Sequence, residues 1–192
     1  KKIAEVAGSS LPNAQWEFVV FESKEANAFC LPGGKIGVYT GILPITQDEA
    51  GLATVISHEV AHAVAHHGAE RMSEAKAMAL GGQAVSALSA NAQPITQSGF
   101  GLAYGIVAKV GRELPHSRLQ ETEADHIGLK FMTRAGYDPE SAVDFWKRFS
   151  AFNEKAGGSG TPAFLRTHPV DSKRIADLQK WIPEVKKEVG GK

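Results

Sequence analysis

The stretch HEVAHAVAHH, from His58 to His67, constrains this chain more than any other part of its sequence. Residues four apart on an α-helix lie on one face, one turn apart, so His58 and His62 project side by side. Glu59 is offset by about 100° around the helix axis, which places its carboxylate beside a cation held by the two imidazoles. In this apolar frame, buried imidazoles without a partner would destabilise the fold. The stretch therefore predicts two metal ligands and a base.

The two later histidines, His66 and His67, are predicted to lie outside the metal site. Ligation by His66 would require three ligands in line on one helix, and such a row cannot close a tetrahedral shell around one ion. The reprolysin-like class of zinc peptidases would have Gly at position 65 and a third His ligand at position 68. The chain has Ala65 and Gly68 instead, which excludes that class.

A third ligand is predicted from the segment SRLQETEADHIGLKF, which begins at Ser117. A catalytic zinc takes three protein ligands and keeps a fourth position open. Glu121 and Asp125 form another i,i+4 pair, so one carboxylate can ligate while the other accepts the free N–H of a ligating histidine. We assign the first role to Glu121 and the second to Asp125. Glu123 points about 160° around the helix from Asp125 and is predicted to face solvent.

Residue patterns predict an α+β fold that is mostly helical. Residues 16–23 and 32–41 favour two or three short strands. The TQDE sequence predicts a helix capped by Thr46 with Glu49 as its partner, which carries the histidines and ends at Gly68. A second helix opens at a capping box at Ser117 and stops near residue 136; two more follow, one to about residue 153 and one after residue 167.

Length and composition narrow the remaining possibilities. The length of 192 residues suits a single domain. Within it, Gly and Pro interrupt the helical pattern of residues 70–111. This segment is predicted to form a mobile lid or a helix at a membrane surface. Lys plus Arg and Asp plus Glu both number 21, so no net charge attracts nucleic acid. Cys30 is the only cysteine, which excludes an internal disulfide, and it is interpreted as a core residue rather than a nucleophile.

Four blocks of the sequence resemble metallopeptidase family forty-eight in order and spacing: NAFCLPGGKIGVYTGIL, HEVAHAVAHH, SRLQETEAD and THPVDSKRI. The resemblance covers nearly the whole chain. It implies a zincin-like fold of the gluzincin type, in which the edge strand of a small β-sheet faces the active-site helix. It also implies one Zn²⁺ per chain on His58, His62 and Glu121, with Glu59 as base and Asp125 behind a ligand. The membrane-bound branches have transmembrane helices that this chain lacks, so we expect a minimal soluble catalytic domain.

Two further regions are candidates for substrate contacts. An extended peptide is held most simply by an exposed strand edge, and the five residues from 36 to 40 are predicted to form that edge; an ordinary hairpin strand is the alternative. They are Ile36, Gly37, Val38, Tyr39 and Thr40. The resemblance places THPVDSKRI near the metal. His168 could then approach the zinc or the oxyanion, and Arg174 could bind the substrate backbone or brace a carboxylate; a simple pair of Arg174 with Asp171 or Asp177 stays open.

Together these features predict a zinc endopeptidase that acts on extended or misfolded polypeptides. A zinc-stabilised chaperone that binds unfolded chains without cutting them is the main alternative, and a zinc hydrolase of small molecules is another. We expect no nucleic acid and no obligate partner, and leave room for peripheral association with a membrane. The resemblance favours the periplasm or cell envelope, with a removed signal or lipid anchor in the precursor.

Overall fold

The computed structural model describes residues 1–74, 76–77, 80, 117–155 and 162–190. Helices dominate these residues, and a three-stranded sheet accompanies them. This confirms the α+β, mostly helical class predicted from the sequence.

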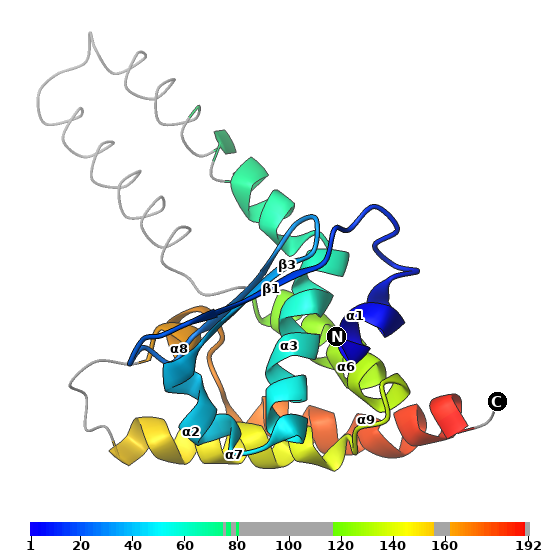
Figure 1. Ribbon diagram of the computed structural model, residues 1–192. Helices are drawn as coiled ribbons and strands as arrows, with labels where there is room; N and C mark the ends of the chain where they lie inside the picture. The colour runs from blue at the N-terminus through cyan, green and yellow to red at the C-terminus, as the bar shows by residue number, and fades with distance from the viewer. Residues whose placement is uncertain (75, 78–79, 81–116, 156–161, 191–192) are drawn as a thin grey trace, which may run out of the picture. The chain divides into compact units, whose positions relative to one another are not determined.

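The strands are β1 (Glu17–Phe21), β2 (Ala28–Leu31) and β3 (Lys35–Tyr39), followed by a short 3₁₀ helix, η1 (Thr40–Ile42). The helices are α1 (Lys2–Ala7), α2 (Leu43–Thr46), α3 (Glu49–Val64), α6 (Arg118–Arg134), α7 (Glu140–Lys155), α8 (Ala163–Thr167) and α9 (Ser172–Gly190). Figure 1 shows α3 extending from α7 to the sheet, and residue contacts join α3 to β2, α6 and α7.

β3 is the central strand of the sheet, whose order is β1-β3-β2. It pairs in parallel with β1 and antiparallel with β2, so both of its backbone edges are hydrogen-bonded. The prediction of an exposed edge at residues 36–40 is therefore wrong for Ile36, Gly37, Val38 and Tyr39, while Thr40 already belongs to η1. Within the described part of the chain, the free edges belong to β1 and β2. Of these two strands, β2 is the one that lies against α3.

The helix that carries the histidines is shorter at both ends than the sequence pattern predicts. Its N-cap is Asp48, whose Oδ1 accepts a hydrogen bond from the backbone N–H of Gly51 at 2.7 Å. Thr46 is already the last residue of α2, so it cannot cap α3. The helix ends at Val64 because the chain turns at His66, which has a φ of 59°. Gly68, the predicted end of the helix, instead belongs to the helical residues that come after the turn at His66.

The positive φ of His66 gives a stability prediction. Left-handed backbone suits glycine, which has no Cβ to clash, and the residue after a helix C-cap is where glycine is most common. Because His66 is exposed, replacing it removes little packing. His66→Gly is expected to raise the free energy of unfolding by about 0.5–1 kcal/mol, measured by urea denaturation. His66→Ala should not stabilise the protein, and an equal gain from both variants would contradict the backbone explanation.

α6 packs closely against α3 where Gly128 meets the backbone of His58. A Cβ at Gly128 would lie 3.1 Å from the backbone nitrogen of His58 and 3.2 Å from its Cα. Because such contacts are tighter than ordinary packing, glycine at this position lets the two helices approach. The close crossing brings the first turns of α6 over the histidine face of α3. Gly128 thus contributes to the site although it carries no side chain.

Residue contacts divide the chain into two units, residues 1–66 with 116–192 and residues 67–115. In the second unit the described residues 67–74, 76–77 and 80 are helical. The predicted lid at 70–111 falls mostly outside the described residues, so it stays a prediction, as does the single domain over 1–192. None of the described helices combines the length and apolarity that a membrane span requires.

Candidate metal centre

His58 and His62 lie one turn apart on α3 and aim their rings at one point. Their Nε2 atoms are 3.1 Å apart, and the rings meet edge to face with centroids 4.7 Å apart. Both side chains are buried, with exposed fractions of 2% and 6%. This is the geometry that i,i+4 spacing imposes on a helix.

Glu121 reaches the same point from the first turn of α6. Its Oε1 lies 3.1 Å from His62 Nε2, and its Oε2 lies 3.3 Å from His58 Nε2. The N-terminus of α6 is held by the capping box of Ser117 and Gln120, as the sequence predicts. A rigid first turn therefore fixes the position of this carboxylate relative to the two imidazoles.

The spacing of these three donors fits a small divalent cation. A regular tetrahedron with metal–ligand distances of 2.0–2.1 Å has edges of about 3.3 Å. The two Nε2 atoms are 3.1 Å apart, and each lies near one oxygen of Glu121, His62 3.1 Å from Oε1 and His58 3.3 Å from Oε2; these separations are close to that edge. Two imidazole nitrogens and a carboxylate oxygen are also a donor set typical of catalytic zinc. The residues present therefore fit the metal that the sequence predicts.

His168, which follows α8, joins the same group. Its Nδ1 lies 3.2 Å from His58 Nε2 and 2.9 Å from Glu121 Oε1, so it is as near to these two donors as they are to each other. All four side chains can offer donor atoms that lie within 4.8 Å of one another. The geometry thus allows His168 either to ligate the metal or to act on a substrate beside it. The metal content of a His168→Ala variant separates the two roles.

Glu59 lies beside the donor cluster rather than in it. Its Oε1 is 3.2 Å from His168 Nε2, yet within the described structure no well-formed hydrogen bond reaches this buried oxygen. Burial raises the pKa of the Glu59 carboxyl above its usual 4.5. A buried carboxylate oxygen without a hydrogen bond is costly unless a ligand or water satisfies it. The arrangement suits a group that exchanges a proton.

Behind the donors, Asp125 and Arg174 form a buried ion pair. Asp125 Oδ1 lies 3.0 Å from His58 Nδ1 and accepts a hydrogen bond from Arg174 Nη2 at 2.8 Å; Arg174 Nε donates to Asp125 Oδ2. An Nδ1–H that donates to Asp125 leaves the Nε2 lone pair of His58 free for a metal. Arg174 Nη1 also lies 2.8 Å from Glu121 Oε2. Of the roles left open for Arg174, the geometry favours holding the carboxylates of Asp125 and Glu121 in place.

Trp146 of α7 supports this ion pair and was not singled out in the sequence. The guanidinium carbon of Arg174 lies 3.9 Å from the ring centroid of Trp146, at cation–π distance. The indole also meets the ring of His58 edge to face, with centroids 5.7 Å apart. A tryptophan at an apolar position of a helix is normally a core residue, so nothing in the sequence distinguished Trp146 from the other core residues. The side chain of Arg174 pairs with neither Asp171 nor Asp177; Asp171 accepts from its backbone N–H.

The charges around His58 predict that metal binding depends on pH. Burial alone would lower the pKa of His58, but the negative charges of Glu121 and Asp125 have a larger effect and raise this pKa to about 9. For His62 burial prevails and lowers the pKa to about 2. The metal-free protein therefore holds a proton on His58 below pH 9, and a metal must displace it. Apparent zinc affinity is expected to rise about tenfold per pH unit from pH 7 to 9 and then level off. Competition with a zinc-binding dye measures this; a flat profile would contradict the protonated state.

The other candidate residues lie where the sequence analysis placed them or outside the site. Glu123 and His66 are exposed, and neither belongs to the described group of possible ligands. His67 is buried but likewise is not in that group. Cys30 lies on β2, where burial, and after it the charge of Glu59, raises the pKa of its thiol to about 12. The thiol is therefore a weak nucleophile.

Comparisons with known proteins agree with this geometry. The model of Peptidase family M48 matches residues 1–182. The chain is 41% identical over 191 residues to the mitochondrial metalloendopeptidase OMA1 of Schizosaccharomyces pombe, which covers 98% of this chain and 53% of that protein. It is 37% identical over 183 residues to OMA1 of Saccharomyces cerevisiae. This match covers 93% of this chain and 50% of that protein.

A bacterial protein is also similar. The chain is 29% identical over 181 residues to a putative beta-barrel assembly-enhancing protease of Vibrio cholerae, covering 91% of this chain and 36% of that protein. The chain therefore spans about half the length of the yeast relatives and about a third of the bacterial one.

Proposed function

The chain belongs to peptidase family M48, and on that premise we propose that it is a zinc-dependent endopeptidase acting on extended or misfolded polypeptides. The observation that carries the proposal is the convergence of His58, His62 and Glu121 on one point, with the carboxylate of Glu59 beside them. Metal ligands without an adjacent base would suit a structural site. A buried base at their side is what hydrolysis needs.

The donors His58 Nε2, His62 Nε2 and a Glu121 oxygen would hold the zinc. A zinc ion held there would act as a Lewis acid, polarising a carbonyl and lowering the pKa of a water molecule toward 7. The polypeptide contributes the rest. Asp125 fixes the tautomer and ring orientation of His58, and Arg174 keeps the Glu121 and Asp125 carboxylates ionised and in place.

Glu59 is the proposed general base and acid. It accepts a proton from the attacking water and returns that proton to the nitrogen of the leaving amine, so no covalent enzyme intermediate forms. For His168, whose Nε2 lies beside the proposed base at 3.2 Å from Glu59 Oε1, the proposed role is to donate to the carbonyl oxygen as negative charge develops there. Zinc retained by His168→Ala would support this role over ligation.

The free edge of β2 is the proposed binding site for the substrate backbone. Asn27 O accepts a hydrogen bond from Tyr39 N, so the backbone groups of residues 27, 29 and 31 face β3. Those of Cys30 then face the free edge, next to α3. A peptide can exchange two hydrogen bonds with Cys30 there and lie extended beside Glu59.

The names of the relatives suggest where such an activity serves. Two are mitochondrial metalloendopeptidases, and one is a putative beta-barrel assembly-enhancing protease. We propose protein quality control in an envelope compartment, as expected from the sequence.

Casein, an unfolded substrate, tests the activity itself. The zinc-loaded chain should cleave casein, a chelator should stop cleavage, and added zinc should restore it. Binding of casein without cleavage would favour the chaperone alternative and contradict the proposal.

A further inference from the structure

The sheet has an apolar outer face that the core does not use. Alternation along the strands puts Ala28, Ile36 and Val38 on the inner face, where all three are buried. The opposite face is apolar over most of its area and carries Phe29 and Leu31 of β2, Gly37 and Tyr39 of β3, and Val19 and Phe21 of β1. Lys35 and Glu17, which form an ion pair, lie on the same face beside Leu31.

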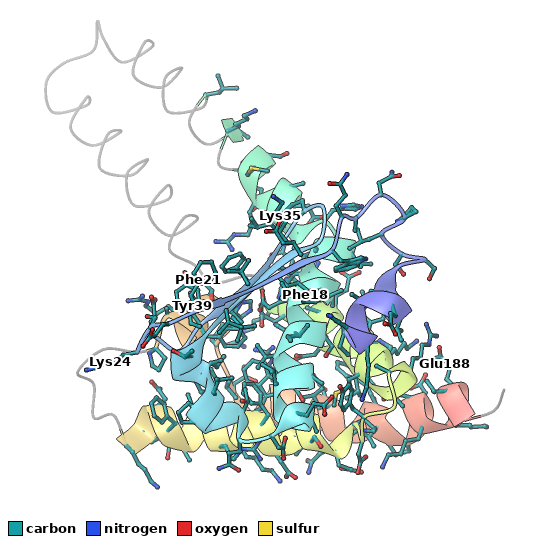
Figure 2. All side chains as sticks on the ribbon, in the orientation of Figure 1. Phe18, Phe21, Lys24, Lys35, Tyr39 and Glu188 are labelled. Atoms are coloured by element: carbon teal, nitrogen blue, oxygen red, sulfur yellow. The ribbon has the colours of Figure 1, made fainter. Side chains whose placement is uncertain are left out.

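Three aromatic rings form the centre of this outer face. The centroids of Phe21 and Tyr39 are 5.1 Å apart, those of Phe21 and Phe29 6.1 Å, and those of Phe29 and Tyr39 6.4 Å. Figure 2 shows Phe21 and Tyr39 close together on the sheet. A Cβ at Gly37 would lie 2.4 Å from Phe29 Cζ and 2.9 Å from Phe21 Cε2. Glycine at this point therefore lets both rings lie flat on β3.

This aromatic platform, defined by Phe21, Phe29, Tyr39 and the flanking Leu31, is exposed at its two ends, at Phe21 and Leu31, and half-buried at Phe29 and Tyr39. Leu31 is 48% exposed and Phe21 39% exposed. Contiguous exposed apolar surface of this kind usually marks a binding site. It reaches the free edge of β2, because Phe29 and Leu31 are residues of that strand. The platform is thus continuous with the proposed site for the substrate backbone.

The position of Cys30 aligns the platform with the catalytic groups. Its side chain is on the inner face, like that of its partner Ile36, and β2 lies against α3, the helix that carries Glu59. A substrate residue paired with Cys30 therefore turns its side chain to the same face of the sheet, at the edge next to α3. Its two neighbours in the peptide pair with Phe29 and Leu31 and turn their side chains to the outer face.

We propose that the aromatic platform selects the substrate sequence by binding two large apolar side chains at alternate positions, one on each side of the residue that pairs with Cys30. This inference rests on the proposed peptidase function and names its substrate class, extended segments with an apolar–x–apolar pattern. Membrane-spanning or core segments of damaged proteins have this character. The apolar contacts give such peptides an advantage of about tenfold in kcat/KM over peptides with serine at both positions.

A peptide series around one casein cleavage site tests the proposal. Each of the six residues around the scissile bond is replaced in turn by serine, and kcat/KM is measured for the zinc-loaded chain. Two positions, separated by one residue, should each show a clear loss. Leu31→Lys should convert one of them to a preference for glutamate, and Phe29→Ala should remove the preference at the other. Val20→Ser, at a 69% exposed residue of β1, is the matched control and should keep the wild-type pattern.

The gain of a glutamate preference cannot arise from misfolding, so the Leu31→Lys result supports the proposal directly. An unchanged specificity pattern in both Leu31→Lys and Phe29→Ala would overturn it while leaving the peptidase function intact. Absence of any cleavage by the wild-type chain would instead overturn the proposed function, and the substrate class with it.

Discussion

Glu59→Gln is expected to lower kcat for peptide hydrolysis by about 10²- to 10⁴-fold, while zinc content and unfolding free energy stay near those of the wild type. The amide has the shape of the carboxylate but cannot accept the proton of the attacking water. Because burial raises the pKa of Glu59, wild-type activity should also fall on the acid side at a pH above 4.5. Single-turnover cleavage of a casein-derived peptide measures the chemical step.

A matched substitution separates this effect from a general loss of charge. Glu123→Gln makes the same chemical change at an exposed position of α6, two residues from Glu121, and should leave kcat unchanged. Normal cleavage by Glu59→Gln would show that another group is the base. Loss of zinc from Glu59→Gln would mean that Glu59 is a ligand instead.

Arg174→Ala is expected to lower the free energy of unfolding of the metal-free protein by about 3–5 kcal/mol. Arg174 is 7% exposed, and its removal leaves the Asp125 and Glu121 carboxylates buried without their guanidinium partner. Arg174 lowers the pKa of Asp125 against the opposing effect of burial, so the pair stabilises the fold above the unfolded pKa and less as pH falls. The difference between variant and wild type should therefore shrink in acid. Urea denaturation at pH 7 and pH 4 measures both effects.

Lys173→Ala is the control for Arg174→Ala. Lys173 pairs with Asp177 at the exposed surface of the same helix, and such pairs contribute little. If Arg174→Ala does not fold, Arg174→Lys keeps the charge without the two parallel hydrogen bonds to Asp125 and should be destabilised to a smaller extent. A cost for Arg174→Ala no larger than that for Lys173→Ala would contradict the bracing role.

Helix geometry explains why residue spacing predicted which side chains of α3 and α6 lie together. The separations between His58 and His62 and between Glu121 and Asp125 are four residues, and a helix converts that spacing into one face wherever it lies in a fold. Capping chemistry at Ser117 is equally local, which is why the start of α6 was correct. Glu59, His168 and Arg174 lie beside the candidate ligands, and their proposed roles follow from that placement.

Features set by tertiary packing could not be predicted in this way. Alternating residues identify Ile36 to Val38 as a strand, but nothing in that pattern says which strands lie on either side of it. β2 is only four residues long and precedes a Pro-Gly-Gly turn, so its alternation is too short to mark it as the edge. Likewise, Trp146 and Gly128 act through contacts between distant segments, and each reads alone as an ordinary core or helix residue.

The metal content of the purified chain tests the central claim most directly. Elemental analysis of the wild type, Glu59→Gln and Glu121→Ala, each loaded with zinc and dialysed at pH 7.5, compares the base with a ligand from a different helix. The account predicts one zinc per chain in the wild type and in Glu59→Gln, and its loss in Glu121→Ala. Full zinc in Glu121→Ala, or none in the wild type, would contradict the convergence of α3 and α6 on one ion.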